Sequence, residues 1–360
     1  MLGSGFGRLF MFAALATLYV RDQGKQQARR RKALTGSAED AAARDGSDRG
    51  RHAEQPSQIP PRGWRDVLIR VYREVGEDRI LANAAGVTYY ILLAMFPGSV
   101  FLVSVYGLFA DAGTIQQHVN ALAAVLPAGA IEVISEQIRR VAGQSGATLS
   151  FSSVFGLALA LWSANSAMKA LFDVLNVAYG EREKRGFFHL NALTLAFTLA
   201  AILFILVALA AVVVIPAVLR ALALGGVAEA LLGIGRWPAL LILLAGALAV
   251  IYRYGPSREE PKWRWVTWGS GFAAVVWLVA SMLFSWYAAN FGKFNETYGT
   301  LGAGVALMTW IWISAVVILV GAELNAEMEH QTARDSTTGP EKPLGARGAK
   351  MADMVGKSTG

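Results

Sequence analysis

The stretch that decides the fold runs from residue 294 to residue 329. It reads FNETYGT at residues 294–300, LGAGVALMTWIWISAVVILVGA at residues 301–322 and ELNAEME at residues 323–329. The middle part contains no charged side chain, and at about 1.5 Å per residue its helix would match a hydrocarbon core of roughly 30 Å. Lipid offers no hydrogen-bond partner to a free backbone N–H or C=O group. The stretch is therefore predicted to be a membrane-spanning helix that ends in an acidic and amide cluster.

The composition supports a membrane protein. Hydrophobic residues make up 54% of the 360 residues and charged residues only 16%, which is too apolar for an ordinary soluble protein. The net charge of +7 would suit nucleic-acid binding, but the basic residues flank hydrophobic segments instead of forming a soluble basic domain. We therefore expect membrane lipids as partners and no nucleic acid. The chain has no cysteine, which excludes disulfides and thiolate metal sites.

Six hydrophobic segments predict an all-α fold: a polytopic membrane protein whose six transmembrane helices form a bundle. The segments cover residues 84–109, 150–172, 190–217, 237–252, 265–289 and 301–322. Pro97 and Gly98 lie near the middle of the first segment, and a kink is predicted there because proline removes a backbone hydrogen bond. The connection at 110–148 is predicted to form two short amphipathic helices, on the periplasmic side, that cap the bundle.

Three regions of different character are expected. Residues 1–63 join a short apolar stretch to a basic linker without large apolar side chains, and the linker is predicted to be disordered. The apolar stretch at 6–20 is marginal for spanning, so an interfacial anchor, an extra short helix and a mis-assigned start codon are alternatives. Residues 64–330 form the membrane domain, and residues 331–360 are predicted to be a disordered cytoplasmic tail.

The membrane domain is expected to begin with an amphipathic helix at residues 64–79. Val67, Leu68, Val71 and Val75 recur there at helical spacing between charged residues. This pattern favours a helix that lies along the membrane surface, with a packing helix as the alternative.

Several motifs resemble the YihY/BrkB family of bacterial inner-membrane proteins. Tyr298, Gly299 and Gly302 belong to the motif YGTLG at the entry to the last hydrophobic segment, which ends in GAELN at residues 321–325. Three further motifs fall in the family's order: AAGVTYYILLAMFP at 84–97, LWSAN at 161–165 with LNVAY at 175–179, and YRYGP at 252–256. The resemblance covers residues 64–330 and implies a role in the cell envelope, without supplying a substrate.

The distribution of basic residues predicts the orientation. Residues 21–79, 180–189, 253–264 and 323–360 hold most of the 33 Lys and Arg residues, whereas the alternate connections hold few. Cytoplasmic loops carry an excess of Lys and Arg. We therefore expect the start of the membrane domain and the C-terminus to be cytoplasmic, in a multi-pass protein of the bacterial inner membrane.

A polar stripe on the second hydrophobic segment is the first candidate site. Ser166, Lys169, Asp173 and Asn176 fall on one helix face, with Asn165 beside them. Ionisable groups within membrane segments mark substrate or ion pathways. The alternative is that Lys169 reaches the lipid headgroups and Asp173 lies in water. For Asn165, which is deeper, an interhelical hydrogen bond is expected.

Two further sets of residues are candidates. Glu323, Asn325 and Glu327 lie at the inner end of the last segment, where they are expected either to meet Arg182, Lys184 or Arg185 or to be solvated. Tyr89 and Tyr90 precede the expected kink at Pro97 and Gly98, and a broken helix can expose backbone groups to a substrate. A packing role for the kink is the alternative.

Catalytic signatures are weak. The four histidines, at positions 52, 118, 189 and 330, have no metal-ligand spacing, and the sequence contains neither a phosphate-binding Gly-Lys loop nor a nucleophile elbow. No metal site, no cofactor and no enzymatic activity are therefore expected, although families similar to this one have carried the label ribonuclease BN.

Two functions are compatible with these observations. The first is transport or export of a lipid-like or small solute, with no ATPase in the same chain. The second is a membrane scaffold or envelope-integrity and virulence factor that transports nothing. A ribonuclease is a third and weaker alternative. The substrate, the coupling ion and the oligomeric state, including a homo-oligomer, are left open by the sequence.

Overall fold

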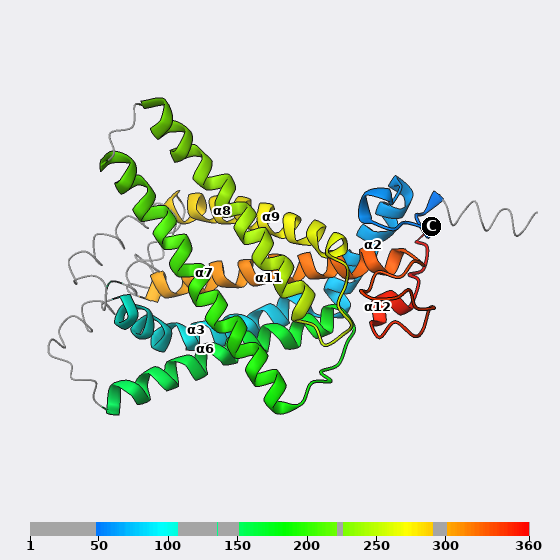
Figure 1. Cartoon of the computed structure of the whole chain (residues 1–360), viewed down its shortest axis with the longest axis horizontal. Coiled ribbons are helices and arrows are strands. Elements are labelled where there is room, and N and C mark those ends of the chain that lie inside the picture. Colours follow the sequence, from blue (N-terminus) through cyan, green and yellow to red (C-terminus); the bar gives the residue numbers. More distant parts are fainter. Residues whose placement is uncertain (1–47, 107–134, 136–150, 222–225, 291–300, 360) are drawn as a thin grey trace, which may run out of the picture.

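The computed structural model describes residues 48–106, 135, 151–221, 226–290 and 301–359 (Figure 1). The regular structure of these residues is helical, which confirms the all-α prediction; one isolated β-bridge joins Pro261 and Thr337. The long helices are α3 (Ile80–Tyr106), α6 (Phe151–Ala178), α7 (Phe187–Ala221), α8 (Gly226–Tyr254), α9 (Trp263–Asn290) and α11 (Leu301–Gln331). The short ones are η1 (Pro56–Gln58), α2 (Pro61–Glu77) and α12 (Lys350–Asp353).

Four stretches of the described residues are long and apolar enough to cross a membrane. They are Phe187–Ala208, Trp237–Tyr254, Trp263–Ala288 and Gly304–Gln331, in α7, α8, α9 and α11. The described part of α3 contains a shorter apolar stretch, Ile80–Met95. The count of six spans therefore stays a prediction. The helices expected within residues 110–148 and the apolar stretch at 6–20 lie outside the described residues.

The helices extend beyond the apolar segments that predicted them. α11 continues from the apolar run through the polar residues up to Gln331, and α8 begins at Gly226, so that Pro238 lies inside it. The added residues are rich in Ala, Leu, Glu and Met, which favour helix. α3 is helical through Pro97 and Gly98, so the structure contains no break in the helix at the expected kink.

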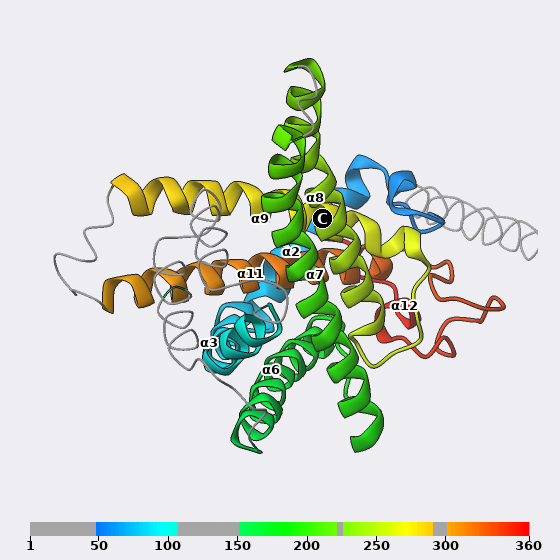
Figure 2. The ribbon, with the colours of Figure 1, turned by 60° about the vertical axis from the view of Figure 1, so that its left-hand side comes forward.

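α11 is the central helix of the bundle. It contacts α2, α3, α6, α9 and α12. Figures 1 and 2 show α7 and α8 crossing steeply past α9 and α11. Phe172, Tyr179, Tyr252 and Leu319 are fully buried where these helices meet. Each long helix therefore buries one face against a neighbour and leaves another face exposed.

The contact between α9 and α11 depends on two glycines. Gly269 of α9 faces the backbone of α11 at Gly321, and a Cβ atom at Gly321 would lie 2.7 Å from the Tyr252 hydroxyl. Asn325 adds polar contacts, because its Oδ1 accepts a hydrogen bond from the Gly269 N–H (2.8 Å) and its Nδ2 donates to the Val266 carbonyl (3.2 Å). Such close approach of helices through small residues is typical of membrane bundles.

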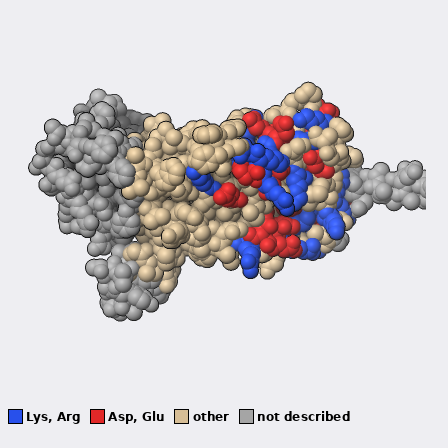
Figure 3. Space-filling model, turned by 90° about the horizontal axis from the view of Figure 1, so that it is seen from below, with Lys and Arg blue, Asp and Glu red and all other residues tan. Residues whose placement is uncertain are grey.

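One end of the molecule carries nearly all the charged side chains of the described residues (Figure 3). We call it the charged end; it comprises residues 48–79, 179–189, 253–264 and 323–359. Beyond it, large apolar side chains such as Leu203, Ile242 and Met282 are exposed on α7, α8 and α9. Their exposure would be costly in water and is favourable against lipid acyl chains.

The tail at residues 332–359 is packed, so the prediction that residues 331–360 are disordered is wrong for these residues. The buried guanidinium of Arg347 donates hydrogen bonds to the carbonyls of Ala333 (2.7 Å) and Ala352 (2.6 Å). The Thr332 hydroxyl donates to the Ala53 carbonyl (2.6 Å). The tail is ordered by polar contacts to backbone groups, which its low apolar content did not reveal.

The linker prediction needs a similar correction. Ala53 and Ile59 are buried together with Val67, Val71 and Trp265, so residues 48–60 are part of the folded protein. Residues 1–47 lie outside the described residues. In α2 the predicted helix is confirmed, and its buried valines pack against α9 and α11, as the packing alternative expected. Its position along a membrane surface stays a prediction.

The glycine contact between α9 and α11 gives a first prediction. A Cβ atom at Gly269 would lie 2.5 Å from Asn325 Oδ1 and closer still to the Gly321 carbonyl oxygen. We expect Gly269→Ala to destabilise the purified protein by about 1–3 kcal/mol through overpacking. The matched control is Gly271→Ala, two residues later in α9, whose Cβ would meet nothing within 4 Å. Equal melting temperatures for the two variants in detergent would contradict this contact.

Candidate functional site

The inner part of α11 places five polar side chains in a buried environment. Glu323, Asn325, Glu327, Glu329 and Gln331 are each at most 1% exposed. Alternate residues of a helix point in widely different directions, because each residue advances by about 100°. The helix can bury all five because α2, α3, α9 and the tail surround it at the charged end. Each of these side chains must therefore find a partner within the protein or remain uncharged.

Glu327 is paired with Arg70 of α2. The Arg70 Nε donates a very short hydrogen bond to Glu327 Oε2, and its Nη2 donates to the Glu327 carbonyl (3.2 Å) and to Gln331 Oε1 (2.8 Å). His330 Nδ1 lies 3.3 Å from the other oxygen of Glu327. This ion pair ties α2 to the end of α11.

Glu329 is paired with Arg258 in the turn between α8 and α9. The two Arg258 nitrogens donate to the two carboxylate oxygens at 3.0 and 2.8 Å, and both side chains are almost completely buried. The Ser336 hydroxyl also donates to Glu329 (2.9 Å), and the guanidinium carbon lies 4.1 Å from the Tyr179 ring centroid. Burial alone would lower the pKa of Arg258, but the charge of Glu329 raises it, so the guanidinium keeps its charge.

Asn176 connects the end of α6 to the loop after α8. Its Oδ1 accepts a hydrogen bond from the Ser257 N–H (2.7 Å), and its Nδ2 donates to Glu183 (3.1 Å). Arg185 also pairs with Glu183 (2.7 Å). Partial burial opposes the charge of Glu183, yet the hydrogen bonds from Arg185 and Asn176 lower the pKa of Glu183 to about 2. The cluster therefore holds a carboxylate that stays ionised.

Glu323 differs from the other carboxylates of α11. It is fully buried, and neither of its carboxylate oxygens receives a hydrogen bond from the described residues. The carboxyl of Asp78, at the corner between α2 and α3, lies within hydrogen-bonding reach of it. Asp78 is half-buried, and burial raises its pKa. A fully buried and a half-buried carboxyl group thus lie next to each other.

The polar stripe of α6 is divided between two environments. Asn165 and Asn176 are buried, whereas Asp173 is exposed. Ser166 donates to the Trp162 carbonyl (3.1 Å), and the Lys169 ammonium lies 5.3 Å from the exposed Trp162 ring. The stripe therefore follows the boundary between the packed and the exposed face of α6. Asn165 has an unpartnered Oδ1, so the expected interhelical hydrogen bond to this oxygen is absent among the described residues.

The remaining predicted residues are distributed as follows. Tyr89 and Tyr90 are exposed on α3 and touch each other edge to face, with ring centroids 5.4 Å apart. Gly302 is buried in the first turn of α11, while Tyr298 and Gly299 lie outside the described residues. Gly302 lies at the end of α11 opposite the charged end, and Tyr89 and Tyr90 lie on the exposed surface of α3, so these three residues are not part of the cluster at the charged end.

The partners expected for the acidic residues of α11 were wrong. Lys184 pairs with Glu181 and Arg185 with Glu183, within the loop that carries all four. Arg70 and Arg258 pair with the carboxylates of α11 instead, because α2 and the turn after α8 pack directly against α11. Arg70, Asp78 and Arg258 were not predicted from the sequence. A signal for Arg70 was available, since it lies one turn after Val67 and directly before Val71 on the amphipathic helix.

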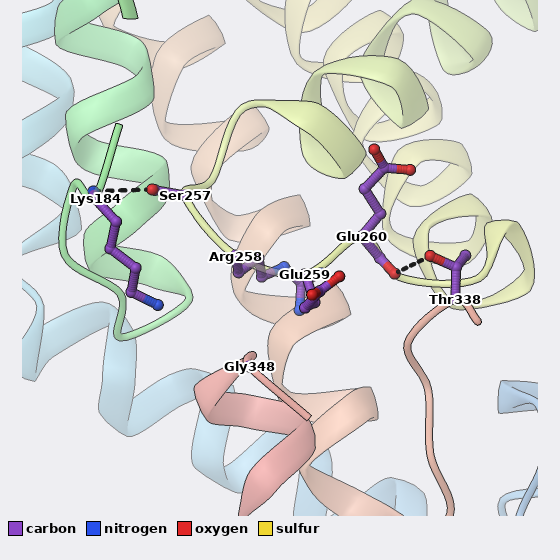
Figure 4. A pocket seen from close by; sticks show the side chains of 7 residues that line it. All are labelled: Lys184, Ser257, Arg258, Glu259, Glu260, Thr338 and Gly348. Carbon is purple, nitrogen blue, oxygen red and sulfur yellow. Dashed lines mark hydrogen bonds between the residues drawn. The ribbon is translucent and has the colours of Figure 1, made fainter. Parts of the chain in front are cut away.

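An open pocket of about 640 Å³ lies beside this cluster (Figure 4). It is lined by Lys184, Ser257, Arg258, Glu259, Glu260, Thr338 and Gly348. The lining carries both signs of charge, and Arg258 is already engaged by Glu329. The pocket therefore gives no preference for an anion or a cation. Among the described residues, no group of three or more His, Asp or Glu side chains is placed to hold a metal ion.

The fold and the charge distribution define an integral membrane protein with apolar helices and one compact charged end. The chain belongs to the virulence factor BrkB family, whose model matches residues 71–345. It is 31% identical to the ribonuclease-like protein YfkH of Bacillus subtilis over 260 residues, which cover 68% of this chain and 88% of YfkH. This confirms the resemblance seen in the motifs.

Two more relatives carry the name UPF0761 membrane protein. The one from Alkalilimnicola ehrlichii is 27% identical over 82% of this chain and 66% of its own length. The one from Vibrio cholerae El Tor is 26% identical over 77% of this chain and 91% of its own length. No solved structure matches the chain.

The Arg258–Glu329 pair gives a second prediction. Arg258→Met leaves a buried carboxylate without its cation, and we expect a loss of about 3–5 kcal/mol in the free energy of unfolding. The double variant Arg258→Met with Glu329→Met should recover much of this loss, since no charge is then buried alone. The control is Arg334→Met, which breaks an exposed pair with Glu341 and should cost about 0–1 kcal/mol. Similar losses for Arg258→Met and Arg334→Met would contradict the assignment.

Proposed function

We propose that this protein transports or exports a lipid-like or small solute across the bacterial inner membrane, with no ATPase in the same chain. The observation that supports transport is a set of buried polar atoms without partners in helices that pass through apolar surroundings: Asn165 Oδ1 in α6 and both carboxylate oxygens of Glu323 in α11. Such groups are costly within a membrane unless a substrate, an ion or a proton uses them.

The inward-facing polar residues define the proposed path. Asn165 lies on the packed face of α6, and Asn176 lies on the same helix at the charged end, where it is bonded to Ser257 and Glu183. Glu323 and Asn325 face inward from α11. Ser166 and Lys169 are partly buried and Asp173 is exposed, so these three lie at the edge of the packed face, where a lysine can reach the headgroups. We therefore restrict the proposed path to the buried members of the predicted set.

The charged end is proposed to face the cytoplasm. Basic loops are retained on the cytoplasmic side, and the basic loops of this chain gather at that end. The exposed apolar residues of α9, including Phe272, Val275 and Met282, are proposed to contact lipid. The name virulence factor, which the family carries, fits an envelope role for a protein with this orientation.

A scaffold is the second candidate function. It is favoured by the satisfied ion pairs at the charged end, Arg70–Glu327 and Arg258–Glu329, which would hold the helices in one arrangement. The ribonuclease-like name belongs to the Bacillus relative. We propose no enzymatic activity for this chain, because its histidines have no metal-ligand spacing in the sequence.

The transport proposal can be tested with the purified full chain in liposomes. Entry and exit of preloaded small solutes and transbilayer movement of labelled phospholipids would be measured together. We expect Asn165→Leu to lower the initial rate by about tenfold or more, equivalent to roughly 1.4 kcal/mol on the barrier. Its melting temperature should be unchanged or higher, because an unpartnered buried amide is replaced by an apolar side chain.

Ser166→Ala is the matched control. It changes the neighbouring residue on the exposed side of α6, and the rate and melting temperature should both equal those of the wild type. If the wild-type protein moves neither solutes nor lipids, the scaffold is favoured. If Asn165→Leu unfolds the protein, Asn165 is a structural residue and the proposed path is wrong at this position.

A further inference from the structure

The neighbouring carboxyl groups of Asp78 and Glu323 take no part in the ion pairs described above. Glu323 is fully buried, and no side chain or backbone donor among the described residues reaches either of its oxygens. Asp78 is half-buried at the end of α2, within hydrogen-bonding reach of Glu323. Two carboxylates in such close contact cannot both be ionised, because like charges repel strongly away from water.

The charged groups around this pair do not neutralise it. From α2, Glu74 and Glu77 face Asp78, and from α11, Glu327 faces both members. The pKa of Glu74 is raised, mainly by burial and secondly by the charge of Glu327. The surroundings of the pair are therefore mainly acidic.

The nearby arginine and histidine side chains are bonded to other residues. Arg70 is engaged by Glu327 and Gln331, and His330 by Glu327. Lys350 of α12 acts on Asp78 through its charge. Tyr179, at the end of α6, also lies near Glu323, and α3 contains no charged residue.

We infer that Asp78 and Glu323 form a proton-binding site, in which one carboxylic acid donates a hydrogen bond to the other carboxylate. A shared proton gives a hydrogen bond to one of the two otherwise unpartnered oxygen atoms of Glu323 and removes one of the two neighbouring negative charges. The ligand is thus a proton, and no metal ion is needed, since the pair supplies only two carboxyl groups. This assignment depends on the contact and the burial of the two residues, and it holds whether or not the protein transports a solute.

The site lies at a strained corner of the backbone. Asp78 ends α2, and the next residue, Arg79, has a positive φ of 52°, which is uncommon for a residue other than glycine. The Asn83 side chain holds the corner by donating to the Asp78 carbonyl (2.8 Å). Loss of the proton would place two negative charges in contact and push this corner away from α11.

Movement of the corner would couple proton release to the arrangement of α2, α3 and α11. If the proposed transport function is correct, the proton is then the coupling ion for it. This last step rests on the proposed function, whereas the proton site itself does not. The two can fail separately, because the proton can be measured without any transported solute.

Infrared difference spectroscopy of the full chain in lipid nanodiscs tests the site directly. Between acid and alkaline pH, the wild type should show the carbonyl band of a protonated carboxylic acid that persists at neutral pH. The band should be lost in Glu323→Gln and in Asp78→Asn. It should be retained in Glu341→Gln, which changes an exposed carboxyl of the tail that pairs only with Arg334.

Stability provides the second readout. The pKa of Asp78 is raised in the folded state, so the folded protein binds more protons than the unfolded chain above the ordinary carboxyl pKa of about 4. The stability contributed by the proton is therefore fully present below that value and is lost as the pH rises through the folded pKa. The melting temperature of the wild type should fall with rising pH, and this fall should be smaller in Glu323→Gln.

Two results of the infrared experiment would overturn the proton site. A wild type without a carboxylic-acid band at neutral pH would show that both groups are ionised. If sodium ions then raise its melting temperature, the pair binds a cation instead of a proton. A band that survives in both variants would belong to another residue. A proton site that is confirmed in a protein without measurable flux would reject the transport function and leave the site standing.

Discussion

The cost of burying carboxylates on α11 governs the structure of the charged end. A helix that leaves the membrane with Glu323, Glu327 and Glu329 fully buried must bring a cation, a donor or a proton to each of them. The Glu327–Arg70 pair joins α2 to α11, and the Glu329–Arg258 pair joins the turn after α8 to α11. Both contacts join segments far apart in the sequence. The charged end is thus the place where the helices are fixed relative to one another.

Lipid imposes the complementary constraint on the rest of the bundle. Helices α7, α8, α9 and α11 contain apolar stretches of membrane-spanning length, and much of their surface outside the charged end is apolar and exposed. Without water to drive apolar association, such helices need small residues and hydrogen bonds at their contacts. Gly269, Gly321 and Asn325 supply both between α9 and α11. Asn165 and Glu323 are among the buried polar groups that lack a partner in this setting, and the functional proposals arise from these two.

The helices and the class of protein could be predicted from the sequence, because long uncharged runs specify helical spans directly. The ends of the helices could not be predicted in the same way. In α11, residues 323–331 are polar, yet they favour helix and are enclosed by other segments. The order of the tail depends on Arg347 bonding to distant carbonyls, which composition does not reveal. The spacing of the polar residues on α6 predicted that they share one face, yet Asn176 is buried against other helices and Asp173 is exposed. Glu323 was identified, but its neighbour Asp78 is 245 positions away and became visible only in the structure.

Buried ion pairs on α11 thus hold the charged end together. A double-mutant cycle between Arg70 and Glu327, with unfolding of the full chain measured in detergent, tests this most directly. Close and desolvated charge pairs have coupling energies of about 1.5 kcal/mol or more, whereas exposed pairs give about 0.2–1 kcal/mol. We predict a coupling energy of about 2–3 kcal/mol between Arg70 and Glu327, which is within the range for residues in one hydrogen-bond network. A coupling energy below about 0.5 kcal/mol would show that α2 is held to α11 by other contacts, and would contradict the account.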